Sequence, residues 1–456
     1  MSKDAQGLDI TGSPACAAAY DRAMADYWGL TGDPVGALRS AVQADPGFAL
    51  GGVAIAALFL VGGFRGDHPE VVNALAFARK TIDGATPRER KHLAAVEAWA
   101  QGRSFEAAQR WEDILVEAPR DALALRLVQD AYFFLGQPLA IRDSSARVEP
   151  FWDKADPLYG FLLGVRAFGL EEAGELGAAE DCARQAIERN PADAWAVHAL
   201  AHVLETACRF DEGADFLKAS RKHWTSAHFM AGHNGWHLGL YQIEQGRHAE
   251  TLADYDRFAA PKLKDDATLD RIDAAALLWR LELEGVDVGA RWADVAKAWR
   301  GHVDDHVLAF NDLHLAFAAA RSPDPQDAAR LRASLAAYVE QGKGDNRDTT
   351  AEIGSALIDG ALKFGAADYR GAIDAITPVA HRAMRIGGSH AQRDILALTL
   401  IAAAERAGDH PLLRALLAER LAVRPTVKVR EALARAGSRS AHARRLPKLD
   451  ADARPN

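Results

Sequence analysis

The sequence predicts an all-α protein, and three observations support this fold class. Alanine is a large share of the 49% hydrophobic residues, and Ala-rich sequence with few β-branched residues favours helix. Helix-length segments repeat along the chain with Gly and Pro between them. No sustained alternation of polar and apolar residues predicts a strand, and the Asn234-Gly235 pair lies inside a helical pattern. We therefore expect helices throughout.

Two segments, 103–123 and 174–195, show a repeated unit most clearly. Each has a Gly before its second helix, then a small residue, an apolar residue and finally a Pro after the helix. These positions are Gly102, Ala107, Trp111 and Pro119 in the first segment and Gly174, Ala179, Ala183 and Pro191 in the second. Small residues let two helices pack closely, and Pro cannot continue a helix. The pattern is typical of the tetratricopeptide repeat, a helix–turn–helix unit of about 34 residues.

Weaker copies of the unit recur at 30–50, 244–256, 364–378 and 405–425. The pattern is poorest from about 257 to 350, where we expect helices of unequal length. Stacked helix pairs bury a shared core that no single pair could close. The chain is therefore predicted to form a right-handed α-solenoid of tetratricopeptide-like helix pairs that curls round a concave polar groove.

The expected organisation is a single helical repeat domain over residues 15–436. Residues 1–14 are expected to form a disordered N-terminal tail. Residues 437–456 lack an apolar stripe, and a disordered C-terminal tail is expected there.

Composition excludes several classes of function. A net charge of −9 argues against nucleic-acid binding, which needs a concentrated basic surface. The most apolar run, 48–63, is shorter than the roughly 20 residues of a membrane span, and the first residues do not resemble a signal peptide. The three cysteines are widely spaced and form neither a disulfide framework nor a CxxC metal motif. We expect a cytoplasmic protein without a membrane or nucleic-acid partner.

Histidines are concentrated around two neighbouring helices. In the repeat register, His198, His202 and Glu205 fall at groove-facing positions in the first helix of one helix pair. Their i, i+4, i+7 spacing places them on one stripe of that helix. His233 and His237 repeat the i, i+4 spacing on the next first helix, with Trp236 beside them. Such pairs suit acid/base chemistry, for which His202, His237 and Glu205 are the catalytic candidates.

A metal site is the second possibility for the same stretch. Imidazoles at i, i+4 can share one metal ion, so His198, His202, His233 and His237 are candidate ligands of a divalent metal. The same side chains could equally form a neutral hydrogen-bonded network, and Trp236 could be a core residue.

Other polar residues are candidate ligand-binding groups in the groove. Asp130 falls at a groove position, although an i, i+4 pair with Arg126 explains it as well. Asp312 and His314 lie in an apolar helix, where at most one is expected to point inward.

A third group follows a double glycine. Ser389 and Gln392 fit a capping box, which leaves His390, Arg393 and Asp394 unexplained in the first turn of a helix. If the solenoid curls enough, we expect this turn to face the His198–His237 stretch across a polar cavity.

Several strings together resemble the tetratricopeptide repeat protein 38 family over roughly residues 15 to 430. They are TPRERKHLAAVEAWAQG (86–102), QDAYFFLGQ (129–137), HNGWHLGLYQIEQG (233–246), LLWRLELEG (277–285), FNDLHLAF (310–317) and GGSHAQRD (387–394). The resemblance implies an all-α solenoid in the cytoplasm, but no reaction. Members often carry His-Asp before the YFFLG-like string, where this chain has Gln129-Asp130, which lowers the weight on Asp130.

Two functional hypotheses remain. In the first, the groove, rich in His, Trp and acidic residues, binds a peptide or protein partner without turnover. In the second, an enclosed His cluster binds a small molecule or acts as an enzyme, by acid/base or divalent-metal-assisted chemistry. Repeat folds most often bind peptides or proteins, which places the first hypothesis ahead. Polar groups inside an apolar frame support the second, since burying them costs stability unless something is gained.

Overall fold

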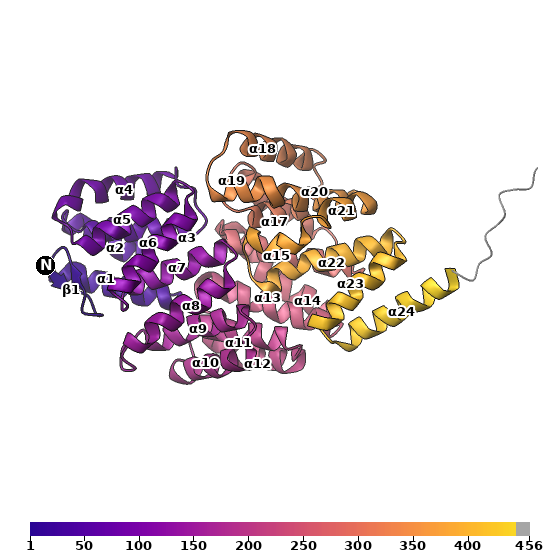
Figure 1. The fold of residues 1–456 in the computed structure, drawn as a ribbon, viewed down its shortest axis with the longest axis horizontal. Coiled ribbons are helices and arrows are strands. Elements are labelled where there is room, and N and C mark those ends of the chain that lie inside the picture. Colours follow the sequence, from indigo (N-terminus) through magenta and orange to yellow (C-terminus); the bar gives the residue numbers. More distant parts are fainter. Residues whose placement is uncertain (444–456) are drawn as a thin grey trace, which may run out of the picture.

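The computed structural model describes residues 1–443, with side chains through residue 437. Within this range the chain forms 24 α-helices, several short 3-10 or π turns and one pair of two-residue strands (Figure 1). The all-α prediction is confirmed. The handedness of the superhelix and the concave groove stay predictions.

The helices are short and follow one another closely. In the first half they are α1 Pro14–Gly29, α2 Pro34–Ala44, α3 Ala49–Val61, α4 Pro69–Thr81, α5 Pro87–Ala100, α6 Ser104–Glu117, α7 Ala122–Phe134, α8 Pro138–Val148, α9 Tyr159–Glu172, α10 Leu176–Arg189, α11 Ala194–Thr206 and α12 Phe210–Trp224. In the second half they are α13 His228–Glu244, α14 His248–Asp254, α15 Thr268–Leu283, α16 Arg291–Trp299, α17 Ala309–Ala320, α18 Asp327–Gln341, α19 Asp345–Thr349, α20 Ser355–Gly365, α21 Tyr369–Ile376, α22 His390–Arg406, α23 His410–Val423 and α24 Val427–Ala443.

Local sequence sets where these helices begin and turn. Thr86 and Glu89 form a capping box at the start of α5, with Pro87 at the first helical position. The glycines that recur in the sequence, Gly102, Gly174 and Gly246, all have positive φ between paired helices. Glycine populates this conformation without steric cost, so the chain can reverse there within a few residues.

The two helices of a pair are buried differently. Second helices such as α10 bury a single stripe, which includes Ala179 and Ala183, and expose the opposite face. First helices such as α11 are buried along almost their whole length, because neighbouring helices cover both of their faces. Polar residues on the first helices therefore lie inside the protein.

Two hydrophobic clusters form the core, and they meet at α13. The first extends from the N-terminal residues to Tyr241, and the second starts at Trp236 and extends to Ala436. The histidine-bearing helices α11 and α13 thus lie at the junction of the two clusters.

The C-terminal half packs against the ends of the N-terminal first helices. Helix α22 contacts α15 and α11, and Figure 1 shows it beside α15. The His390 amide donates to Glu172 at the end of α9 (2.8 Å), and Arg424 pairs with Glu205 at the end of α11 (2.7 Å). The predicted approach of the residue-390 turn to the histidine-bearing helices is confirmed, but the two regions touch directly rather than across a cavity.

The N-terminal residues differ from the expected disordered tail. The strands β1 Ser2–Lys3 and β2 Asp9–Ile10 pair antiparallel, and Ile10 is fully buried. The Thr11 amide and hydroxyl both donate to the buried Glu89 carboxylate, which anchors the hairpin to α5. In the expected C-terminal tail, residues 437–443 continue α24, and residues 444–456 lie outside the described part of the chain.

The segment with the poorest repeat pattern has helices of unequal length, as expected. Helices α16, α18 and α19 have 9, 15 and 5 residues. Two π-helical turns, Tyr255–Ala259 and Thr350–Gly354, also interrupt the regular pairing here.

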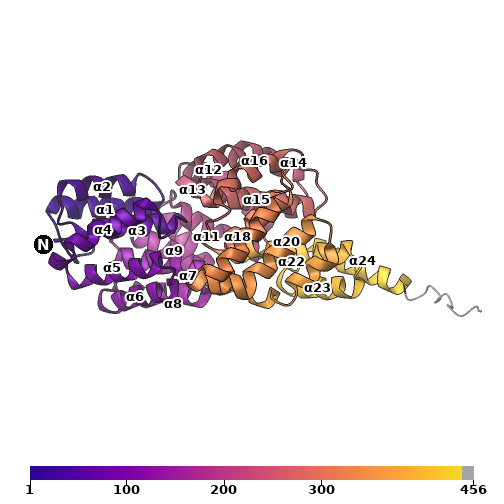
Figure 2. The same ribbon diagram turned by 90° about the horizontal axis from the view of Figure 1, so that it is seen from above.

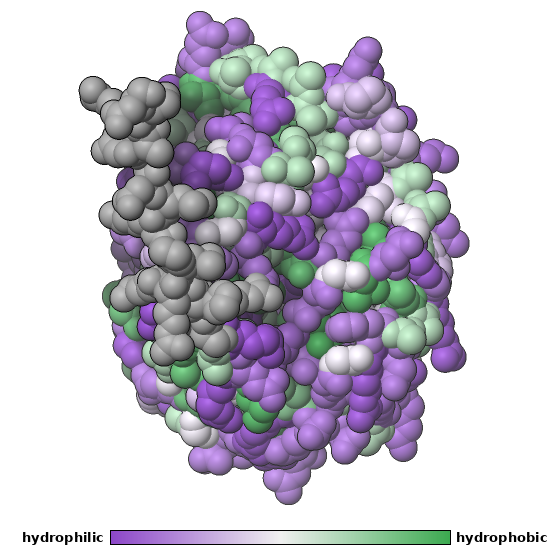
Figure 3. Space-filling model, turned by 90° about the vertical axis from the view of Figure 1, so that its right-hand side faces the viewer, coloured by the Kyte–Doolittle hydropathy of each residue, from purple (hydrophilic) through white to green (hydrophobic). Residues whose placement is uncertain are grey.

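Seen from above, the helices form one elongated body with the N-terminal and C-terminal helices at opposite ends (Figure 2). The C-terminal end is mostly hydrophilic, with apolar residues in small scattered groups (Figure 3). Among residues 1–443, no helix combines the length and apolar character that crossing a bilayer requires.

Candidate metal centre

Four histidines from two adjacent helices come together in the core. His198 and His202 lie on α11, and His233 and His237 lie on α13, which packs against α11. One ring nitrogen from each histidine can be chosen so that all four lie within 4.8 Å of one another. The i, i+4 spacing therefore placed the two pairs face to face, as the sequence predicts. These four residues are called the His cluster below.

The His cluster is buried, and most of its nitrogens lack partners. His202 and His237 are fully buried, and His198 and His233 are almost so. Both ring nitrogens of His198, His202 and His237 have no hydrogen-bond partner among the described residues. An unsatisfied buried polar group costs about 1–3 kcal/mol, so native proteins usually pair such groups. Several unpaired ring nitrogens within this distance of one another are an arrangement expected of metal ligands.

Carboxylates support two of the histidines from behind. His233 Nδ1 lies 2.8 Å from an oxygen of Asp273 on α15, which leaves Nε2 available. Glu171 on α9 places an oxygen 3.4 Å from His202 Nδ1, close but without the alignment of a hydrogen bond. Metal-binding histidines typically hold a carboxylate on the ring nitrogen that does not bind the ion. The cluster has this second layer at two of its four members.

Burial sets the protonation of the cluster. It lowers the pKa of His198 and of His237 well below the usual value, and the charges of neighbouring histidines lower both further. At His202 burial acts in the same direction, but the carboxylates of Glu171, Glu172 and Glu205 together outweigh it and raise the pKa. Burial would raise the pKa of Glu171, yet its contacts with His202 and Thr206 lower it. His198 and His237 are therefore neutral near pH 7, which is the form that binds metals.

Aromatic side chains surround the cluster. Trp236 stacks on His233 with ring centroids 5.1 Å apart, and Phe168 stacks on His198 at 5.5 Å. Trp195 also touches His198. Trp236 is both a core residue and a neighbour of the cluster. Rings of this kind exclude water, which strengthens electrostatic interactions inside the site.

Glu205 does not join the cluster. It follows His198 and His202 on the predicted stripe, but it lies at the end of α11 and pairs with Arg424 at 2.7 Å. The carboxylates close to His202 are instead Glu171 and Glu172, which with His202 form a second group that could hold an ion. The catalytic role of Glu205 stays a prediction, and the Arg424 guanidinium already neutralises the Glu205 charge.

The residues after the double glycine hold the two halves of the protein together. Ser389 and Gln392 form the predicted capping box of α22. The His390 amide and the Arg393 guanidinium both contact Glu172, at 2.8 and 3.5 Å. Asp394 pairs with Arg420 at 2.7 Å.

Three other predicted ligand residues have protein partners outside the His cluster. Asp130 accepts from the Tyr27 hydroxyl and pairs with Arg126, the alternative that the sequence offered. Asp312 pairs with His306 at 3.0 Å, and His314 Nδ1 lies 2.8 Å from the Phe310 carbonyl oxygen. The expectation that only one of Asp312 and His314 points inward is wrong, because helices pack on several sides of α17 and bury both.

Sequence reasoning missed the carboxylates that support the cluster. Glu171 lies near the end of α9, where no feature of the sequence singles it out. Asp273 stands near the start of a long apolar run on α15, and an acidic residue in such a run was an available signal.

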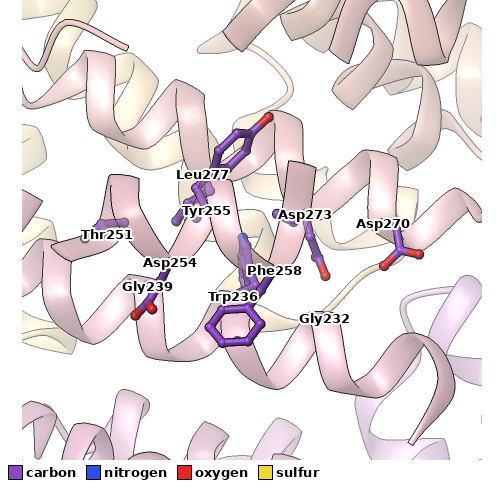
Figure 4. A pocket seen from close by; sticks show the side chains of 12 residues that line it. Gly232, Trp236, Gly239, Thr251, Asp254, Tyr255, Phe258, Asp270, Asp273 and Leu277 are labelled. Carbon is purple, nitrogen blue, oxygen red and sulfur yellow. The ribbon is translucent and has the colours of Figure 1, made fainter. Parts of the chain in front are cut away.

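A cavity lies next to Trp236 and Asp273, between α13, the turn after α14 and α15 (Figure 4). Its space is about 390 Å³, open solvent included. Trp236 stacks on His233, and Asp273 is hydrogen-bonded to the same histidine. Two residues of the cavity wall therefore contact the His cluster.

A comparison of the sequence with models of known protein families finds no family that matches. The resemblance to the tetratricopeptide repeat protein 38 family therefore stays a prediction.

Proposed function

We propose that His198, His202, His233 and His237 bind a divalent transition-metal ion and that the protein is a metal-dependent enzyme acting on a small molecule. The observation that carries the proposal is the set of buried, unpaired ring nitrogens within 4.8 Å of one another. Imidazole ligands suit zinc, copper, iron and nickel. Binding would satisfy the nitrogens and displace the proton that Glu171 favours on His202.

The ligand set favours chemistry over a purely structural role. Structural zinc sites are usually built from cysteine thiolates, alone or with histidine, whereas catalytic sites favour neutral histidines. Four imidazoles leave the full charge of the ion in place. Water or substrate would reach that charge if the ion took a fifth ligand or if one imidazole gave up its position, and the ion could then polarise the substrate or activate the water. The fold also has two extended hydrophobic clusters, so it does not depend on a metal for its core.

The hypothesis of a peptide-binding groove receives less support from the geometry. The predicted groove residues His198, His202, His237 and Asp130 are all buried, so a peptide could reach them only if the helices moved apart. We also propose that the fold is the right-handed solenoid, and the location the cytoplasm, that the sequence predicts.

Metal analysis of the purified protein, without a histidine tag, tests the proposal. We expect about one equivalent of a transition metal in the wild type and none in His198→Ala/His202→Ala. The matched control is His314→Ala, which also removes a fully buried imidazole but lies outside the His cluster. It should keep the metal.

Circular dichroism of each variant separates loss of the site from loss of the fold. Absence of metal from wild type, even after incubation with zinc, iron, copper or nickel salts, would contradict the proposal. So would equal metal content in the double variant and the wild type.

A further inference from the structure

Glycines form part of the wall of the cavity beside Trp236. Its wall includes three glycines of α13, Gly232, Gly235 and Gly239, whose spacing places them on one face of the helix. A Cβ atom at Gly235 would have only the Phe258 Cβ near it, at 4.0 Å. At Gly232 it would lie 2.9 Å from a carboxylate oxygen of Asp270. The glycines therefore keep open a space that Asp270 borders.

Three polar groups on the cavity wall are buried and unpaired. Asp270 is 6% exposed and has no hydrogen bond or ion pair with the described residues. The Tyr255 hydroxyl and the Trp236 indole N–H are also buried without a partner. A largely buried carboxylate that only cavity water can solvate is destabilising, so its retention on a cavity wall points to a ligand.

The charge of the wall selects the kind of ligand. Asp254, Asp270 and Asp273 line the cavity, and no lysine or arginine does. Asp254 already accepts a hydrogen bond from Gln242 at 2.8 Å, and Asp273 is bonded to His233. Asp270 is thus the carboxylate left for a cation.

The remaining surface is apolar. Beside Thr251 and Ala259, the wall is formed by Phe258, Leu277 and the rings of Tyr255 and Trp236 (Figure 4), and the cavity is partly open to solvent. Aromatic rings also attract cations through their faces.

We propose that this cavity binds a small organic amine, with its ammonium group paired to Asp270 and its hydrocarbon part against Phe258 and Leu277. That the amine is a substrate of the metal centre rests on the proposed function. It is supported by Asp273 and Trp236, which line the cavity and both contact His233. Binding itself needs no metal.

Isothermal titration calorimetry of the full chain tests the amine site. The probes are benzylamine, cyclohexylamine and butylamine, with benzyl alcohol as the neutral counterpart of benzylamine. We expect at least one amine to bind, and benzyl alcohol to bind at least 10-fold more weakly than benzylamine. Asp270→Asn should weaken amine binding at least 10-fold, because it removes the charge and keeps the shape.

Gly235→Ala provides an independent variant, because its methyl group enters the cavity without a clash and should also weaken binding about 10-fold. The matched control is Gly177→Ala, on the exposed face of α10, which adds a methyl group to a helical glycine in open space. It should bind the amines like wild type.

Failure of all three amines to bind wild type, or equal affinity in wild type and both cavity variants, overturns the proposal. Metal content measured on the same samples separates the two proposals. Metal without amine binding contradicts only the amine site, and amine binding without metal contradicts only the metal-dependent function.

Discussion

Two groups of histidines, the pair His302 and His306 and the His cluster, differ in whether their ring nitrogens have hydrogen-bond partners. Around α17, both nitrogens of His302 and of His306 have partners: Asp305 and Asp266 for the first, Asp312 and Ser334 for the second. In the His cluster, both nitrogens of His198, His202 and His237 have none among the described residues. Burial and histidine content are therefore poor guides to a site, and unpaired nitrogens aimed at one another are a better one.

The largest expected effect comes from replacing one histidine in each group by leucine, in metal-free protein. His306→Leu leaves the buried Asp312 carboxylate without its partner and should lower the free energy of unfolding by about 3 kcal/mol. His237→Leu breaks no hydrogen bond and removes two unpaired nitrogens, so it should be neutral or stabilise by about 1 kcal/mol. Urea unfolding followed by circular dichroism measures both. A similar decrease in the free energy of unfolding of the two variants would contradict the difference between the two groups of histidines.

Metal addition should stabilise only a protein with an intact His cluster. At 100 times its Kd, an ion that binds only the folded state raises the free energy of unfolding by about 2.7 kcal/mol. Wild type treated with chelator and then reloaded should show this gain, as should His306→Leu, whereas His237→Leu should not. The measurement is thermal or urea unfolding with and without metal. A gain in His237→Leu equal to that of wild type would place the ion elsewhere.

Replacing a carboxylate that supports the His cluster should have a smaller effect, which is on the metal affinity. Asp273→Asn weakens the contact that orients His233 and should reduce metal affinity about 10–100-fold. Asp254→Asn is the matched control, because Asp254 lines the same cavity but bonds Gln242 instead of a histidine. Competition with a chromophoric chelator gives both affinities. Equal affinity in Asp273→Asn and wild type would remove Asp273 from the site.

The smallest effect concerns Asp270, whose pKa burial raises to about 7. Asp273 and Asp265 raise it further, and Lys262 and Arg271 oppose them. Between pH 4 and pH 7 the unfolded chain holds Asp270 ionised while the folded protein keeps it protonated, so wild type loses stability as the pH rises. Asp270→Asn lacks this loss.

The free energy of unfolding of Asp270→Asn should therefore rise relative to that of wild type between pH 4 and pH 7. The expected rise is only about 1 kcal/mol, because water in the cavity screens the charge. Above pH 7 the difference between the two proteins should stay constant. Unfolding curves at pH 4.5, 6 and 8 measure this trend. A gap that does not change with pH would show that Asp270 is ionised throughout.

The helical fold and the His cluster could be predicted because both depend on short-range patterns. The i, i+4 pairs at His198/His202 and His233/His237 lie on helices that follow each other in the repeat, so repeat packing alone brings them together. The turn glycines and the Ser389–Gln392 capping box are equally local.

What could not be predicted depends on contacts between distant segments. Asp273 reaches His233 from 40 residues away, and Glu172 meets His390 across 218 residues. The N-terminal hairpin was missed for the same reason, because Thr11 is held by Glu89, 78 residues later. Where the sequence predicts a cavity between the two halves, α22 contacts α11 and α15, and the His390 amide donates to Glu172.

X-ray absorption spectroscopy at the K-edge of the bound metal, on untagged wild-type protein, tests the central claim most directly. The account predicts about one ion per chain, surrounded by four imidazole nitrogens, at about 2.0–2.1 Å if the ion is zinc. A sulfur shell, fewer than three imidazoles, or no specifically bound ion would contradict it.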